Sequence, residues 1–265
     1  MPQIVGYLRF AWQLANGFRL AGEQALAAER DRDLAPYLNR EKPWQVLDLA
    51  NGRLRPQFLI LNAQGQMVYG IDWANRPESP IKDLLYRIAR GLYGLHLAAG
   101  AGPSRREKLV CGDVGKLPFA DCSFDLVTSI AAFEHFLDVP RVVSELERVL
   151  RPGGVAWIRI HPFACPSGGH NLGFTEIPLR AVPPGIDPWD HLRRRRLPFN
   201  VPLNEWRIGQ YSQTFTEHFE IVKQYCATRE GDEFLTPQIE KELALYSRDE
   251  LTCAAYQIVA RKPLA

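Results

Sequence analysis

Residues 109–158 read LVCGDVGKLPFADCSFDLVTSIAAFEHFLDVPRVVSELERVLRPGGVAWI and alternate short apolar runs with one helical run. Apolar runs at 108–114, 123–130 and 155–160 predict three strands. The helix between the last two begins near Pro140, which is tolerated in a first turn, and ends at the RPGG sequence. Its apolar stripe consists of Val142, Val143, Leu146, Val149 and Leu150. Strands that alternate with helices predict a parallel sheet.

The same alternation extends toward the N-terminus. Apolar runs at 44–50 and 67–74 predict two further strands, with a helix over 55–64 between them. A longer helix is predicted from residue 80 onward, because its apolar residues share one helical face. These residues are Ile81, Leu84, Leu85, Ile88, Leu92 and Leu95.

Residues 161–202 interrupt this rhythm with many prolines and glycines, which predicts a substrate-side insertion or lid. Its aromatic residues predict that the insertion is ordered: Phe163, Phe174, Trp189 and Phe199. After it, helical runs at 203–219 and 236–246 alternate with strand-like runs at 219–228 and 251–262. We expect these last two strands to pair as an antiparallel edge hairpin.

These elements predict an α/β fold with a doubly wound, mostly parallel, seven-stranded sheet. A chain of 265 residues is short enough for one domain, which we assign to residues 41–265. Residues 1–40 are expected to form an N-terminal helical extension. Its apolar stripe, which we expect to cover a core, consists of Ile4, Leu8, Ala11, Ala15 and Phe18.

Composition narrows the functional class. The 32 basic and 30 acidic residues give a net charge of +2, so we expect no nucleic-acid partner. The five cysteines include no CxxC pair, and their odd number favours a reduced, cytoplasmic location. Arg9 and Arg19 interrupt the apolar patches near the N-terminus, so neither a membrane span nor a signal peptide is expected.

Polar residues follow the predicted strands, where doubly wound sheets bind their ligands. They are Asp48, Asn51, Gly52, Asp72, Asp113, Ser129 and His161. Asp72 lies about 20 residues beyond the first turn, a position from which a carboxylate accepts two hydrogen bonds from a ribose diol. An aspartate at a strand end alternatively caps a following helix, and Asp113 has the same two interpretations.

The ordered series GDVGKLPF, SFDLV and LRPGG resembles the middle of a class I S-adenosylmethionine-dependent methyltransferase of the small-molecule, type 11-like group. The resemblance covers about residues 44–160. It implies a Rossmann-like methyltransferase fold and S-adenosylmethionine as the cofactor, with Asp113 and Val114 at the adenine and Asp72 at the ribose. The other residues that we assign to cofactor binding are Asp48, Ala50, Asn51, Gly52, Trp73 and Ser129.

The turn after the first strand departs from the family pattern. A DxGxGxG-like sequence is expected there, and this chain has Asp48, Ala50, Gly52 and Leu54 at the corresponding positions. Ala50 is tolerable if its φ is negative. Leu54 is expected either to push the helix from the strand or to fill cofactor volume.

Two facts make the replaced glycines less damaging to cofactor binding. The cofactor has no pyrophosphate that demands close backbone contact, and amides at a helix N-terminus can hold its carboxylate. Arg53 or Arg55 either adds a charged partner or lies on a solvated loop face.

Methyl transfer often requires a base for the acceptor proton, and neutral histidine suits that task. The candidates are His161 and His170, with His135 and His191 as further possibilities, and each is alternatively structural. We favour His170, because PSGGHN presents it on a glycine-rich loop. No metal ligands are assigned. Arg193–Arg196 form either an anion clamp for the substrate or a solvated face.

The expected acceptor is a small molecule. The segments GGH, HLR, LNEWRIGQY and YSRDELTCAAYQIVARKP resemble methyltransferases found with bacterial cell-surface polysaccharide enzymes, which implies a sugar or nucleotide-sugar hydroxyl and a role in polysaccharide biosynthesis. One alternative is an inactive methyltransferase-like binding scaffold, suggested by Ala50 and Leu54. A NAD-dependent oxidoreductase ranks lower, because DLANGRL lacks GxGxxG. The sequence leaves the oligomeric state open.

Overall fold

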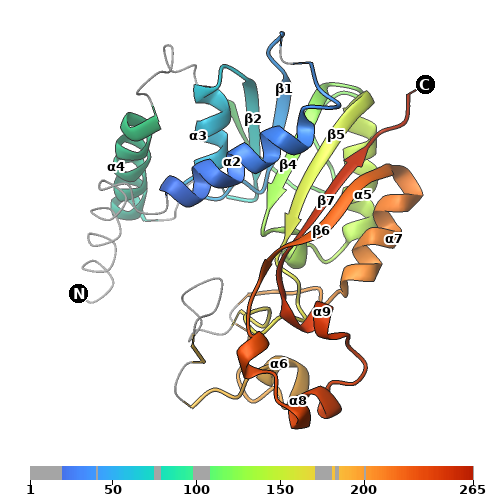
Figure 1. Ribbon diagram of the computed structural model, residues 1–265. Helices are drawn as coiled ribbons and strands as arrows, with labels where there is room; N and C mark the ends of the chain where they lie inside the picture. The colour runs from blue at the N-terminus through green and yellow to red at the C-terminus, as the bar shows by residue number, and fades with distance from the viewer. Residues whose placement is uncertain are drawn as a thin grey trace. The chain divides into compact units, whose positions relative to one another are not determined.

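The computed structural model describes residues 20–39, 41–74, 79–97, 108–170, 181–182, 185–199 and 201–264. Its apolar runs form a seven-stranded sheet in the order β3-β2-β1-β4-β5-β7-β6, which confirms the predicted α/β fold (Figure 1). The strands are β1 Gln45–Leu49, β2 Met67–Asp72, β3 Lys108–Cys111, β4 Phe124–Ile130, β5 Leu150–Ile160, β6 Glu220–Arg229 and β7 Cys253–Arg261.

Strand direction follows the sequence prediction at both ends of the sheet. β1 and β3 both run parallel to β2, and β6 pairs with β7 in antiparallel fashion. The predicted C-terminal hairpin is therefore confirmed. Within it, β6 is the edge strand and β7 lies between β5 and β6.

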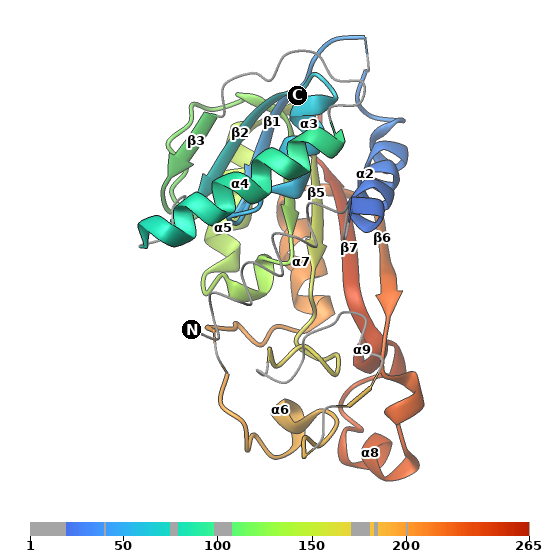
Figure 2. The same cartoon turned by 90° about the vertical axis from the view of Figure 1, so that its left-hand side faces the viewer.

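The chain divides into two compact units, each described by itself. The first comprises residues 1–128, 148–155 and 264–265, and the second comprises 129–147 and 156–263. In the first unit, α3 (Pro56–Ala63) packs on β2 and contacts both α2 (Leu20–Leu34) and α4 (Pro80–Leu97) (Figure 2). Arg30 of α2 is buried and donates hydrogen bonds to Gln57 at 2.7 Å and to Gln64 at 3.0 Å.

The helix predicted from residue 80 onward is α4, and its apolar face is largely exposed in the described structure. Ile81, Leu84 and Leu95 are more than half exposed, and Ile88 is 46% exposed. The residues that α4 buries are small or amphipathic instead, namely Ala89 and Tyr93. The helix itself was predicted correctly, but periodicity alone does not identify which side meets a neighbour.

The helix before β5 has the predicted stripe, since Val142, Val143, Leu146, Val149 and Leu150 are all buried. It is α5 (Val139–Val149). The helix ends at Val149, just before the RPGG sequence as predicted, but β5 begins at Leu150 and is therefore longer than the predicted 155–160. Gly153, within β5, has a φ of +78°, a conformation that glycine adopts without strain.

The second unit contains further short helices. They are η1 Phe133–His135, α6 Asp190–Arg193, α7 Ile208–His218, η2 Asp232–Phe234, α8 Pro237–Glu242 and α9 Arg248–Thr252. α7 contacts β6 and β7, and α6, α8 and α9 gather near the ends of the same two strands (Figure 1).

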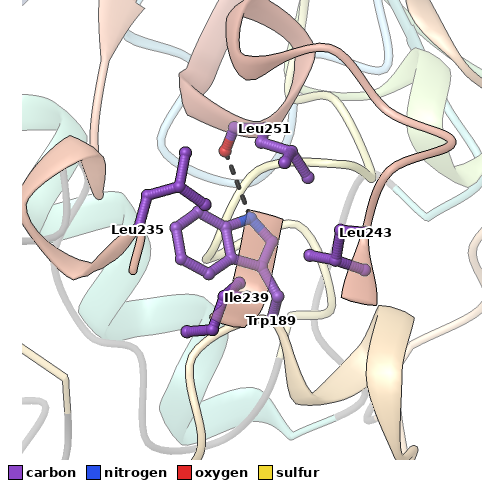
Figure 3. Close-up of a cluster of buried hydrophobic side chains, with 5 residues drawn as sticks. All are labelled: Trp189, Leu235, Ile239, Leu243 and Leu251. Carbon is purple, nitrogen blue, oxygen red and sulfur yellow. Dashed lines mark hydrogen bonds between the residues drawn. The ribbon is translucent and has the colours of Figure 1, made fainter. Parts of the chain in front are cut away.

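Trp189, in the described part of the predicted insertion, belongs to a buried hydrophobic cluster. Its ring is fully buried among Leu235, Ile239, Leu243 and Leu251 (Figure 3). The indole N–H lies 3.2 Å from the carbonyl oxygen of Leu251 and 3.1 Å from that of Ala164. Trp189 is thus packed in a hydrophobic cluster, and an ordered insertion over 161–202 as a whole stays a prediction.

The other predicted aromatics have different outcomes. Phe163 is buried, and its ring meets that of Phe199 edge-on, with centroids 5.7 Å apart. Phe174 lies outside the described residues, as does the predicted N-terminal stripe at 4–18.

Candidate functional site

The carboxyl ends of β1, β2 and β3 meet at one edge of the sheet. Asp48 pairs with Gly70 and Asp72 with Cys111 in the two parallel ladders. Beyond the ladders, the Ala50 N–H donates to the carbonyl of Ile71 at 2.8 Å. The register therefore brings the turn after β1 next to the end of β2.

Asp72 connects these strand ends through its carboxylate. Oδ2 accepts a hydrogen bond from the N–H of Gly52 at 2.9 Å, and Oδ1 accepts one from Ala74 at 3.1 Å. Neither Gly52 nor Ala74 lies in a helix, so these bonds are not the helix cap that the sequence offered as the alternative role of Asp72. These two bonds do not exhaust the acceptor positions of a carboxylate, so the group retains capacity for ribose hydroxyls.

The turn after β1 has a strained backbone. Ala50 has a φ of 52°, so the condition under which alanine was expected to be tolerable is not met. Gly52, at 64°, adopts the same left-handed region without cost, whereas an alanine there costs about 1 kcal/mol. Strain of this kind clusters at ligand-binding turns, where the surrounding structure holds it.

The Leu54 side chain packs against α4. Its side chain packs against the cluster formed by Ala89 and Tyr93, together with Leu20 and Leu59. Helix residues are thus its partners, and this packing explains how a bulky residue replaces the third glycine of the family pattern.

Asn51 carries the unsatisfied polar group of this turn. Both its amide nitrogen and its amide oxygen are buried with no hydrogen-bond partner in the described chain. The amide lies over Gly70, where a Cβ atom would come within 1.9 Å of the Asn51 nitrogen. Buried amides normally have partners, so an orphan here indicates a site for a polar ligand or water.

Asp48 lies beneath the turn and is almost completely buried. Its Oδ1 accepts a hydrogen bond from the Thr128 hydroxyl at 3.0 Å. Burial raises the pKa of Asp48 to about 7, while the Thr128 hydrogen bond and the charge of Arg30 act in the opposite direction. Asp48 therefore supports the turn from inside rather than presenting an open carboxylate.

The remaining predicted cofactor residues have varied surroundings. Asp113 is exposed and accepts a hydrogen bond from Gly115 at 2.8 Å, with half-buried Val114 beside it. Trp73 is 79% exposed. Ser129 lies inside β4 and is fully buried, which corrects its predicted place beyond the end of that strand.

The two arginines of the turn differ from one another. Arg55 is only 2% exposed, so a solvated loop face is wrong for this residue. Arg53 is half-buried, and its Nη1 has no hydrogen-bond partner within the described ranges. A charged contact with a bound carboxylate remains a prediction for Arg53.

His161 directly follows β5, as predicted, and is buried in a hydrogen-bonded chain of side chains. Its Nδ1 donates to the carbonyl of Ala254 at 2.7 Å, and its Nε2 lies 3.1 Å from the Ser167 hydroxyl. Ser167 in turn hydrogen-bonds Glu230. The serine occupies the middle of this chain, whereas a nucleophile triad has the histidine there, so the contacts are those of a positioning network.

His170 lies beside His161 and His135, with ring centroids 5.1 Å and 4.9 Å away. Burial, together with the neighbouring histidines, lowers the pKa of His170 to about 3. A base is most effective when its pKa lies near the working pH, so His170 is a weak base in this state. Its role in acceptor deprotonation stays a prediction.

His191 is buried away from solvent. Its Nε2 donates to the carbonyl of Phe163 at 2.8 Å, and burial lowers its pKa to about 4. Cβ atoms on Gly169 would clash with its ring at 2.6 Å, so the glycine of PSGGHN allows close packing here.

Sequence reasoning missed three residues of this region: Glu134, Ser167 and Glu230. Glu134 is 1% exposed, and burial raises its pKa to about 7. The sequence did contain a signal for Glu134, because this carboxylate directly precedes His135, one of the candidate histidines. Ser167 and Glu230 meet across 63 residues, and no local pattern indicates such a contact.

Arg193–Arg196 are paired with carboxylates of the chain itself. Arg193 contacts Glu242, Arg194 and Arg196 contact Asp187, and Arg195 contacts Glu205. These ion pairs leave the anion-clamp hypothesis without support. Separately, none of the helices in the described part of the chain is both long and apolar enough to cross a membrane.

Comparison with known proteins points to one enzyme class. Residues 90–158 match the family model described as a methyltransferase domain. Sterol 24-C-methyltransferase of Gibberella zeae is 34% identical over 129 residues, which cover 48% of this chain and 30% of that protein. A probable chloroplastic tocopherol O-methyltransferase of Oryza sativa is 34% identical over 150 residues, covering 52% and 38%. This chain thus spans about a third of the length of these curated relatives.

A solved structure supports the fold. A SAM-dependent methyltransferase from Methanosarcina mazei has a TM-score of 0.54 and 17% identity, with 88% of this chain and 98% of that chain covered. This likeness concerns architecture, and the seven-stranded mixed sheet described above is that architecture.

Proposed function

We propose that this chain, which has the class I S-adenosylmethionine-dependent methyltransferase fold and contains a methyltransferase-domain segment, binds S-adenosylmethionine and methylates a small molecule. The observation that carries the proposal is the orphaned Asn51 amide in the turn after β1, where Asp72 also retains acceptor capacity. When bound, the cofactor supplies an electrophilic methyl group on its sulfonium.

The strand-end residues fit such a ligand by their chemistry. We assign the Asn51 amide to its polar groups, the Asp72 carboxylate to its ribose hydroxyls, and Asp113 with Val114 to its adenine. Trp73 offers an exposed ring next to Asp72. Gly70 supports the assignment indirectly, since a side chain there would displace Asn51.

The scaffold alternative rests on the two replaced glycines. Leu54 packs on helix residues, which removes one of its two supports, and Ala50 adopts the left-handed conformation that a glycine would supply. The oxidoreductase alternative receives no support from the methyltransferase names of the relatives. We therefore favour the enzyme.

For the acceptor, we propose a hydroxyl group of a sugar or nucleotide sugar, with residues 161–202 on the acceptor side. Support comes from the resemblance of the C-terminal segments to methyltransferases found with polysaccharide enzymes. The names of two relatives suggest sterols and tocopherols as competitors. Methyl transfer from a radiolabelled donor to a panel of all three classes tests this, and labelling of lipids without labelling of sugars would contradict it.

The Asp72→Ala substitution is expected to weaken donor binding by about 10- to 100-fold, because hydrogen bonds to a charged group contribute about 1.5–3 kcal/mol. Equilibrium dialysis with radiolabelled S-adenosylmethionine measures the effect. Asp121→Ala is the matched control, since Asp121 is a 74% exposed carboxylate in the same unit. Equal affinity of a folded Asp72→Ala variant and the parent would contradict our assignment of the ribose contact.

A further inference from the structure

Three potential metal ligands converge in the second unit. Ligand atoms of Glu134, His135 and His170 all lie within 4.8 Å of one another. Oε1 of Glu134 is 3.9 Å from Nε2 of His135, and the His135 and His170 rings meet edge-on. Glu134 and His135 lie in the short helix η1, and His170 ends the turn that follows β5.

Two of these ligand atoms are buried without a hydrogen-bond partner among the described residues. Glu134 is 1% exposed, and its Oε1 receives no hydrogen bond from any described residue. Nε2 of His170 is likewise buried and unbonded within that part of the chain. A buried carboxylate oxygen without a donor is costly, and a cation between these atoms removes that cost.

A hydrogen bond to the backbone orients the His135 ring for metal binding. Nδ1 of His135 lies 2.9 Å from the carbonyl oxygen of Pro202, which can only accept a hydrogen bond. The proton therefore resides on Nδ1, and Nε2 carries a lone pair toward Glu134. This donation to a backbone carbonyl is the usual support of a metal-binding histidine.

His161 is excluded as a fourth ligand, although its ring lies near His170. Both of its nitrogens are used, one by the carbonyl of Ala254 and the other by the Ser167 hydroxyl. Its backbone N–H lies 3.4 Å from Oε2 of Glu134 and so holds the other carboxylate oxygen in place. The cluster thus offers three ligand atoms.

We propose that Glu134, His135 and His170 bind one divalent first-row transition-metal ion of the zinc type, with at least one coordination position open to water or an oxygen ligand. Two imidazoles and one carboxylate suit such an ion better than Mg²⁺ or Ca²⁺, which prefer oxygen ligands. Ligands about 2.0–2.1 Å from a tetrahedral zinc ion lie about 3.3 Å apart. The ligand atoms now lie up to 4.8 Å apart, so small side-chain rotations that bring them closer together complete the site.

The test uses the full chain without a polyhistidine tag, stripped of metal by a chelator. Calorimetric titration with ZnCl₂ is expected to give one site per chain with a micromolar or lower Kd. Co²⁺ is expected to give visible absorption bands of a low-coordinate site, which report nitrogen and oxygen ligands directly.

Three variants identify the ligands: Glu134→Gln, His135→Gln and His170→Asn. The last retains a residue that tolerates the positive φ of 48° at this position. Each is expected to weaken Zn²⁺ binding at least 30-fold, whereas His96→Gln, on the exposed end of α4, leaves it unchanged. Thermal unfolding confirms that each variant is folded, and half-exposed His135 provides the decisive variant should buried Glu134 not tolerate substitution.

Absence of Zn²⁺ and Co²⁺ binding by the folded chain at 1 mM metal would overturn the proposal. Binding that is equally tight in the His135 and His170 variants, or a preference for Mg²⁺ over Zn²⁺, would do the same. The inference does not depend on the methyl donor, because metal and donor binding are measured separately on the same protein. Failure of one proposal is therefore distinguishable from failure of the other.

Discussion

The Trp189→Ala substitution is expected to lower the free energy of unfolding by about 3–5 kcal/mol, the usual cost of removing a buried tryptophan. The ring is fully buried among four aliphatic side chains, so alanine leaves a large cavity (Figure 3). Two carbonyls, those of Ala164 and Leu251, also lose their hydrogen-bond donor. Urea denaturation of parent and variant measures the difference.

Two further substitutions make this prediction specific. Trp189→Phe keeps most of the apolar area but not the N–H, and we expect it to cost less than the alanine variant. Leu245→Ala removes a leucine that is 84% exposed, and we expect a change within about 0.5 kcal/mol. A Trp189→Ala variant no less stable than the Leu245→Ala variant would show that the cluster does not stabilise the fold.

The Asp48→Asn substitution is expected to make stability less dependent on pH. Burial raises the pKa of Asp48 from 3.8 to about 7, so the folded state holds a proton that the unfolded state releases. The stabilisation from this proton is complete below pH 3.8 and is lost as the pH rises through 7. Asparagine is neutral throughout and can still accept the Thr128 hydrogen bond through its oxygen.

From pH 4 to pH 8 the parent should therefore lose about 4 kcal/mol that the variant retains, at 1.36 kcal/mol for each unit of pKa shift. Chemical denaturation at several pH values measures both curves. Asp121→Asn serves as the control at an exposed position, since the Asp121 side chain is 74% exposed and contacts Arg148 at the surface. Parallel curves for parent and Asp48→Asn would mean that Asp48 is not protonated in the folded chain near neutral pH.

Local sequence pattern predicted the strands well, because each buried strand is an apolar run bounded by polar residues. The position of β7 between β5 and β6 was not predicted, since pairing across the sheet is a long-range property. The exposed face of α4 has a similar explanation. Helical periodicity describes one element, whereas Ala89 and Tyr93 became buried through contact with Leu20, Leu54 and Leu59.

The sequence predicted only those residues of the candidate site that directly follow a strand. Asp72 and Gly52 are brought together by parallel register, and that register follows from the fold class. The orphaned Asn51 amide depends on Gly70, which lies 19 positions later in the chain, and no motif indicates this contact. The ion pairs of Arg193–Arg196 also involve carboxylates from several segments, so the basic run alone gave a misleading indication of an anion site.

Titration calorimetry with S-adenosylhomocysteine tests most directly whether the turn after β1 still holds a methyl donor despite its two lost glycines. We predict one site per chain with a micromolar Kd, accompanied by a rise in melting temperature. No heat and no thermal shift at millimolar ligand, with a correctly folded chain, would contradict the account.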